Sequence, residues 1–118
     1  MAKNIAKGRM GEAAALEFLK AKGHDILHSN FRWDRKEIDL ISVDNKILVF
    51  TEVKTRTSFD FGFPEEAVDE RKKQHIKVVA EEFILNNPQY KEMRFDIISV
   101  LLNNLTVKEI RHFESAFY

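Results

Sequence analysis

The sequence predicts an α/β fold in which a mixed β-sheet is flanked by helices. Helical and strand periodicities follow one another in the order α-β-β-β-α-β-β, and two strand pairs are joined by turns rich in Asn or Asp. A long helix separates these pairs, so the strands on either side of it can lie parallel in one sheet. The 118 residues are expected to form a single domain, since this length supports one hydrophobic core.

Each element has its own signal in the sequence. The first helix is expected over residues 5–22, which are rich in alanine and stop at Gly23. The second is expected from Pro64, followed by two acidic residues, to about Leu85. The hairpin turns are expected at Asp44-Asn45 and Asn103-Asn104, because these residues tolerate left-handed backbone. The strands are expected at residues 25–32, 37–43, 46–54, 94–102 and 105–113.

The composition excludes several classes of protein. Basic and acidic residues number 19 each, whereas a dedicated nucleic-acid-binding protein usually has a basic excess. An enzyme that acts on nucleic acid remains compatible with this balance. There are no cysteines, which excludes disulfides and thiolate zinc sites. No signal peptide and no apolar run of about 18–20 residues is present, so we expect a cytoplasmic protein with no membrane partner.

Three charged residues interrupt the hairpin EIDLISVDNKILVFTEVKTR: Asp39, Glu52 and Lys54. A two-residue loop at Asp44-Asn45 would put Asp39 opposite Phe50, with Glu52 a diagonal neighbour on the same face. A four-residue loop would put Asp39 directly opposite Glu52. A three-residue loop would put the two acids on opposite faces of the sheet.

Two neighbouring carboxylates in a partly buried place repel each other, so either one stays protonated or a cation lies between them. Asp39, Glu52 and the Val53 carbonyl together offer oxygen ligands that suit Mg²⁺ or Mn²⁺. Lys54 shares a face with Glu52 and could orient a water molecule or face a scissile phosphate. This set suits metal-assisted phosphodiester hydrolysis. The alternative is that all three charged residues are exposed on the solvent face of the hairpin.

Two further charged residues lie on helix faces that should be apolar. Glu12 shares a stripe with Leu16 and Leu19, which indicates a functional acid. The alternative for Glu12 is a favourable position near a helix start. Lys72 interrupts the apolar stripe of the second helix, and its alternative is a buried stem with a solvated ammonium group.

Contacts to DNA are expected from basic residues around the acids, although each basic cluster could equally be solvated surface. The residues that we assign to nucleic-acid binding are Arg32, Arg35, Lys36, Arg56 and Lys72. Phe59, Phe61 and Phe63 could instead bind a partner protein or form a homodimer, the alternative being that they pack on the sheet.

Ordered motifs across nearly the whole chain resemble the YraN family, an uncharacterised bacterial family with a restriction-endonuclease-like fold. They are GRMGEAAALEFLKAKGHDIL, NFRWDRKEIDLI, LVFTEVKTR, FGFPEEAVDERKKQHI and RFDII. The resemblance implies a PD-(D/E)-x-K nuclease core, as in Holliday-junction resolvases. Mapped onto this chain, Asp39 is the motif's first acid and Glu52-Val53-Lys54 is its (D/E)-x-K. Glu12 corresponds to the helical acid and Lys72 to the lysine of the following helix.

The function expected from the residues and the resemblance is a Mg²⁺- or Mn²⁺-dependent endonuclease that hydrolyses DNA phosphodiester bonds. Its catalytic residues would be Glu12, Asp39, Glu52 and Lys54, and a branched or otherwise structured DNA is the expected substrate. The alternative is a non-catalytic nucleic-acid-binding module or a protein-interaction factor that retains the nuclease fold.

Overall fold

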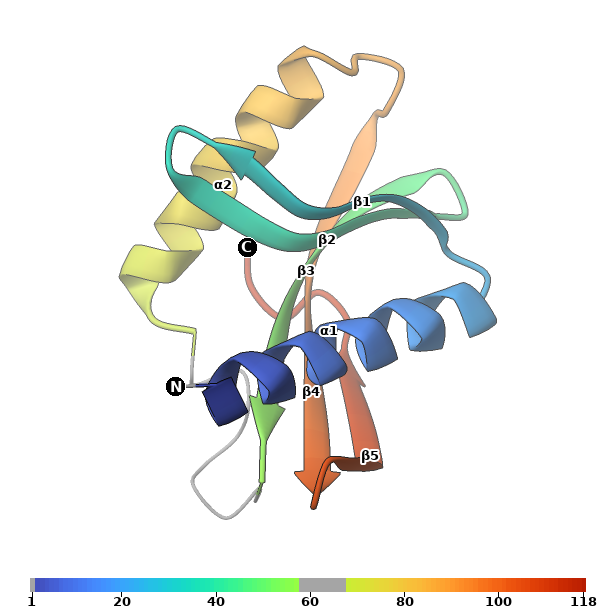
Figure 1. The fold of residues 1–118 in the computed structure, drawn as a ribbon. Coiled ribbons are helices and arrows are strands. Elements are labelled where there is room, and N and C mark those ends of the chain that lie inside the picture. The colour runs from blue at the N-terminus through green and yellow to red at the C-terminus, as the bar shows by residue number, and fades with distance from the viewer. Residues whose placement is uncertain (1, 58–67) are drawn as a thin grey trace.

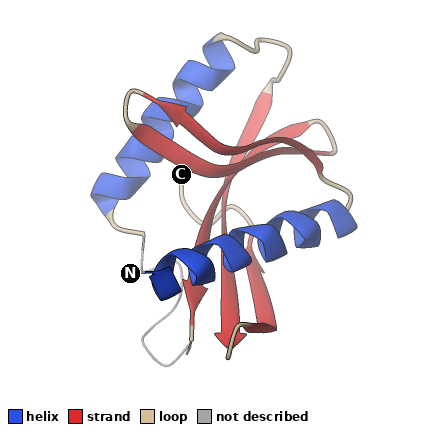
Figure 2. Ribbon diagram, viewed as in Figure 1, coloured by secondary structure: helices blue, strands red, loops and turns tan. Residues whose placement is uncertain are grey.

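In the computed structural model, which describes residues 2–57 and 68–118, a five-stranded mixed sheet carries one helix on each face (Figures 1 and 2). The element order is the predicted α-β-β-β-α-β-β. The elements are α1 (Ala2–Ala21), β1 (Asp25–Trp33), β2 (Lys36–Asp44), β3 (Ile47–Arg56), α2 (Glu70–Leu85), β4 (Glu92–Asn103) and β5 (Thr106–Phe113). The strands lie in sequence order across the sheet. Among the described strand pairs, β3–β4 is parallel and the others are antiparallel. The predicted mixed sheet flanked by helices is therefore confirmed.

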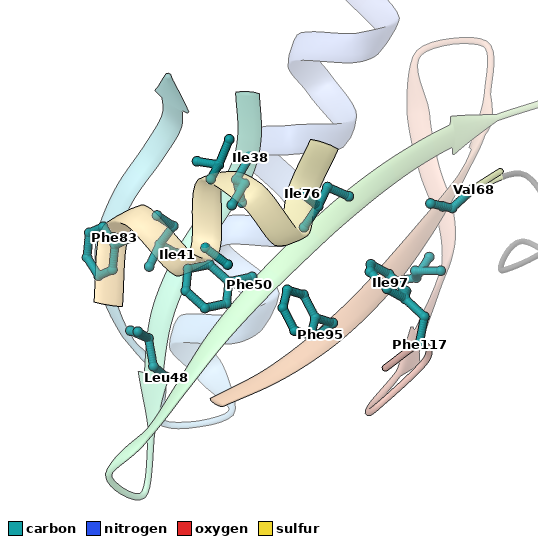
Figure 3. Packing of buried hydrophobic residues seen from close by; sticks show 12 residues of the cluster. Ile38, Ile41, Leu48, Phe50, Val68, Ile76, Phe83, Phe95, Ile97 and Phe117 are labelled. Carbon is teal, nitrogen blue, oxygen red and sulfur yellow. The ribbon is translucent and has the colours of Figure 1, made fainter. Parts of the chain in front are cut away.

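The two faces of the sheet bury different clusters of apolar side chains. On one face, Ala15 and Leu19 of α1 pack against Val53 of β3 and residues of β4. On the other face, Phe83 of α2 packs against Phe50 and neighbouring side chains (Figure 3). Because side chains alternate across a strand, these two clusters require β3 to be apolar on both sides. A charged residue in the middle of β3 therefore cannot avoid burial.

The boundaries of the helices follow from local backbone contacts. Gly23, with a φ of 96°, ends α1 as predicted, and its N–H donates to the Lys20 carbonyl at 3.0 Å. The described helix α2 begins at Glu70, so the predicted helix is wrong at Val68 and Asp69, and its predicted start at Pro64 lies outside the described residues. Asp69 is extended (φ −76°, ψ 171°), and its carboxylate caps the helix by accepting from the Lys72 N–H at 2.8 Å.

Two other predictions concern the phenylalanine loop and membrane crossing. The loop containing Phe59, Phe61 and Phe63 lies outside the described residues. Neither helix of the described chain combines the length and the apolar character that a bilayer crossing requires.

Candidate active site

The register of the β2–β3 hairpin brings Asp39 and Glu52 together. The turn residues are Asn45 and Lys46, with φ of 52° and 73°, so the turn predicted at Asp44-Asn45 is wrong by one residue. Asp44 pairs with Ile47. If this register is continued along both strands, Asp39 lies opposite Glu52. This is the arrangement expected of the four-residue loop, and the diagonal arrangement is wrong.

The two strands separate at this point, and the Asp39 carboxylate replaces a backbone partner. The described β2–β3 ladder ends at the pair Leu40 and Thr51. Beyond it, the Val53 N–H donates to Asp39 Oδ2 at 2.8 Å. A carboxylate that accepts a backbone N–H is held in one orientation. The side chain of Asp39 is therefore fixed at the fork between the strands.

Burial and mutual repulsion shift the ionisation of both carboxyl groups. The Glu52 side chain is only 5% exposed, and burial followed by the charge of Asp39 raises the pKa of Glu52 to about 7. Burial also raises the pKa of Asp39, against the hydrogen bond from Val53. The two carboxyl groups lie close enough that the charge of Asp39 disfavours ionisation of Glu52. Glu52 Oε2 is buried without a hydrogen-bond partner among the described residues.

Two lysines border this pair from different elements. Lys54 Nζ lies 3.9 Å and Lys72 Nζ 3.7 Å from Glu52 Oε1. Their side chains are 28% and 37% exposed, so both ammonium groups reach solvent as well as Glu52. The Asp69 cap fixes the first turn of α2 and with it the direction of Lys72. The ammonium group of Lys72 therefore contacts both Glu52 and solvent, and not solvent alone.

Glu12 approaches the same place from α1. Glu12 lines one hollow with Val53 and Lys54, and burial, followed by the charge of Asp39, raises the pKa of its carboxyl group. The close approach of the helix depends on Gly11, because a Cβ there would overlap the side chain of Thr55 on β3. Asp39 and Glu52 therefore meet within the hairpin, Lys54 and Lys72 lie beside Glu52, and Glu12 approaches from α1 on the side of Asp39.

The predicted DNA-binding residues divide into two groups. Lys72 lies at the acids, and Arg56 ends β3. The others lie at the β1–β2 hairpin, where Arg32 pairs with Glu37 at 3.4 Å and Lys36 pairs with Asp34 at 3.3 Å. Their contribution to DNA binding stays a prediction.

Comparison with known proteins places the chain in a family. Residues 11–100 match the family described as "Uncharacterised protein family UPF0102". A UPF0102 protein of Flavobacterium psychrophilum is 42% identical over 118 residues, covering 100% of this chain and 98% of that protein. A UPF0102 protein of Caldanaerobacter subterraneus subsp. tengcongensis is 46% identical over 114 residues, covering 93% of each chain. The chain belongs to UPF0102. This confirms the resemblance to the YraN family, which is the same family.

One residue of the UPF0102 site, Asn30, was not predicted from the sequence. With its amide nitrogen turned toward the acids, Asn30 of β1 donates to Glu37 Oε1 at 2.6 Å and to Glu12 Oε2 at 3.3 Å. Asn30 thereby ties the helical acid to the hairpin. The signal available in the sequence was the poor alternation of the first strand, and Asn30 indeed has a φ of 53°.

The described part of this UPF0102 chain contains no group of three or more His, Asp or Glu side chains arranged to hold a metal ion. The predicted ligand set differs from such a group, since it has two carboxylates, Asp39 and Glu52, and the Val53 carbonyl. Mg²⁺ is often held by only one or two carboxylates, with substrate phosphate and water completing its shell. The predicted set therefore stays a prediction of this kind of site.

Proposed function

We propose that this UPF0102 chain is a Mg²⁺- or Mn²⁺-dependent endonuclease that hydrolyses DNA phosphodiester bonds. The observation that carries the proposal is the meeting of Asp39 and Glu52 at the fork of β2 and β3, beside Lys54 and Lys72. Paired carboxylates bordered by lysines suit a reaction at a phosphate, because a nucleophile must reach a negatively charged group and the charge that develops in the transition state must be stabilised.

A divalent cation fits the residues present. Glu52 Oε2 has no partner among the described residues, and the neighbouring Asp39 disfavours a second ionised carboxylate. A cation between the two groups would compensate both charges, and the Val53 carbonyl would add a neutral oxygen. When bound, it would supply Lewis-acid stabilisation to the phosphate under attack.

The remaining residues have separate tasks in this proposal. Lys54 shares the face of Glu52 and would stabilise the charge that develops on the phosphate or orient the attacking water. Lys72 would bind a neighbouring phosphate once its attraction to Glu52 is released. Glu12, which lines the same hollow as Lys54, would exchange a proton with water or hold the outer ligands of the metal ion.

A nicking assay tests the proposal. Duplex, single-stranded, flap and four-way DNA are incubated with Mn²⁺ and the wild-type protein, Glu52→Gln or Glu81→Gln. We expect wild type and the exposed-site control Glu81→Gln to cleave and Glu52→Gln to lose at least 100-fold in rate, about the effect of one electrostatic group. Preference for the four-way or flap substrate would extend the resemblance to junction resolvases. Absence of cleavage of every substrate by wild type would refute the proposal.

Metal binding gives a readout that is independent of activity. A ligand at 100 times its Kd stabilises the native state by about 2.7 kcal/mol. We expect Mn²⁺ to raise the thermal midpoint of wild type at pH 8 and to leave that of Asp39→Asn unchanged. Asn at this position keeps an oxygen for the Val53 N–H and removes only the charge.

A second candidate is a non-catalytic DNA-binding module that retains the fold. It is favoured by the two ion pairs of Glu52 with Lys54 and Lys72, which already compensate its charge without a metal ion. This candidate predicts salt-dependent DNA affinity that Mn²⁺ does not change, together with no metal-dependent rise in the thermal midpoint.

A further inference from the structure

Two hollows meet the N-terminal half of α1 at Lys7, one beside Glu12 and Lys54 and the other at the β4–β5 turn. The first hollow, of about 310 Å³, lies over Val53, Lys54 and Thr55 and is bordered by Lys7, Gly8 and Glu12. The second, of about 410 Å³, is bordered by Lys7 again. Because Lys7 borders both hollows, a ligand strand that crosses Lys7 would touch the two in turn, and we call this route the path.

Lys7 differs from the lysines of the site. Lys54 and Lys72 both face Glu52, at 3.9 and 3.7 Å. Lys7 is partly buried, yet it forms no ion pair with any residue in the described ranges 2–57 and 68–118. A half-buried ammonium group without a carboxylate partner is suited to an anion that arrives with a ligand.

The far end of the path offers neutral polar groups and one exposed apolar side chain. Thr57 follows β3, and Asn103 and Asn104 belong to the β4–β5 turn, all three being exposed. Leu105 of the same turn is 52% exposed. Amides and hydroxyls can bond to phosphate, sugar or base edges, and an exposed leucine can pack against a sugar or base.

We propose that one strand of a DNA substrate leaves the candidate site over Gly8 and Lys7 and reaches the β4–β5 turn. This inference rests on the proposed function, since it takes the ligand at the acids to be DNA. Lys7 neutralises a phosphate of that strand, and the turn contacts the next nucleotides without reading their sequence.

Gly8 provides a clean test, because a Cβ added there meets nothing within 4 Å. Substitutions at this position therefore place a side chain in the hollow without disturbing the fold. Gly8→Glu puts a negative charge in the path, and Gly8→Gln is its neutral control of nearly the same shape. Lys7→Gln removes the cation, and its control is Lys46→Gln, at the opposite end of β3.

The assay is fluorescence anisotropy with an end-labelled 20-nucleotide single-stranded DNA in EDTA, so that cleavage plays no part. One phosphate contact on a single strand contributes a salt slope of about −0.7, a factor of about 5 between 1 M and 0.1 M salt. We expect Lys7→Gln to weaken binding about fivefold at 0.1 M salt and to reduce the slope by about 0.7. Gly8→Glu should bind at least about fivefold more weakly than Gly8→Gln, and Lys46→Gln should bind as wild type.

The outcomes separate the path from the proposed function. If Lys72→Gln weakens binding while Gly8→Glu and Gly8→Gln bind alike, DNA binds at the acids and the path is refuted. Equal losses in Lys7→Gln and Lys46→Gln would refute it too, because they would show only a general effect of charge. If wild type binds no DNA in EDTA, the path is refuted, whereas the proposed function is decided separately by the nicking assay with Mn²⁺.

Discussion

Neutralising Glu52 should stabilise the protein at neutral and alkaline pH in the absence of metal ions. The pKa of Glu52 is raised from its ordinary value of 4.5 to about 7, first by burial and then by the charge of Asp39. The folded protein therefore binds this proton more tightly than the unfolded chain does. Stability from this group is fully present below pH 4.5 and falls as the pH rises toward 7.

The size of the effect follows from the shift. Each pH unit between the folded and unfolded pKa is worth about 1.4 kcal/mol, so the ionised Glu52 lowers the free energy of unfolding by about 3 kcal/mol above pH 7. Solvent screening does not reduce this figure, because the side chain is only 5% exposed. Glu52→Gln has no charge to bury. The difference in free energy of unfolding between Glu52→Gln and wild type should therefore be about 3 kcal/mol larger at pH 8 than at pH 4.

Urea unfolding in EDTA, followed by circular dichroism at pH 4 and pH 8, measures this difference. Urea is uncharged and leaves the electrostatics intact. Comparing each variant with wild type at both pH values cancels any packing difference between Glu and Gln. Glu81→Gln, at an exposed position on α2, is the control and should show no such pH dependence. A difference that stays constant from pH 4 to pH 8, or that reverses, would refute the argument that Glu52 is buried beside a like charge.

Two further predictions concern packing and the buried charge network. Gly11→Ala should destabilise the fold by about 1–3 kcal/mol, because its Cβ would overlap Thr55 and push α1 off the sheet. Gly8→Ala on the same helix is the control and should stabilise the fold by about 0.5–1 kcal/mol. Equal thermal midpoints for the two variants would contradict the close packing at Gly11. Asp96→Asn should lower the free energy of unfolding at pH 7 by about 3 kcal/mol, because the buried carboxylate accepts from His112 at 2.7 Å and from the Arg94 guanidinium group at 2.9 Å. The hydrogen bonds lower the pKa of Asp96, so this loss in urea unfolding should shrink as the pH falls below about 4; a loss independent of pH would refute it.

The sequence predicted the elements of the fold better than the residues at their turns. At both predicted turns, Asn-containing pairs were expected to fill the two left-handed positions. In the structure these positions are Asn45-Lys46 and Asn104-Leu105, one residue later in each case. At the first turn the reason is a tertiary contact, since Asp44 stays in the strand and pairs with Arg94 at 3.4 Å. Turn propensity is local and contains no information about a partner fifty residues away.

The helix boundary failed for a related reason. Proline followed by two acids is a sound local signal for a helix start, but α2 begins at Glu70 because Asp69 caps it. Both signals are present in the sequence, and the choice between them depends on contacts made by the folded chain. Val68 is buried, which anchors the segment before the cap on the sheet.

The candidate site depends on the one-residue difference at the first turn. Spacing alone could identify Asp39, Glu52 and Lys54, because a strand of period two fixes which of its own side chains share a face. It left the register across the hairpin open, and the observed register is the one that places the two acids opposite each other. Asn30 was out of reach of this reasoning, since its role depends on β1 and α1 meeting at Glu12.

The fork between β2 and β3 explains how a stable sheet accommodates these charges. In a continuous ladder, the backbone of β2 would lie where the Asp39 carboxylate now accepts from β3. Because the described pairing stops at Leu40 and Thr51, the Val53 N–H is free to donate to Asp39 Oδ2 at 2.8 Å. The sheet thus loses a backbone hydrogen bond and gains a charged one that fixes the acid in place. The Val53–Thr55 segment that follows the fork lines the hollow beside Gly8 and Glu12, so the residue whose N–H holds Asp39 also borders this hollow.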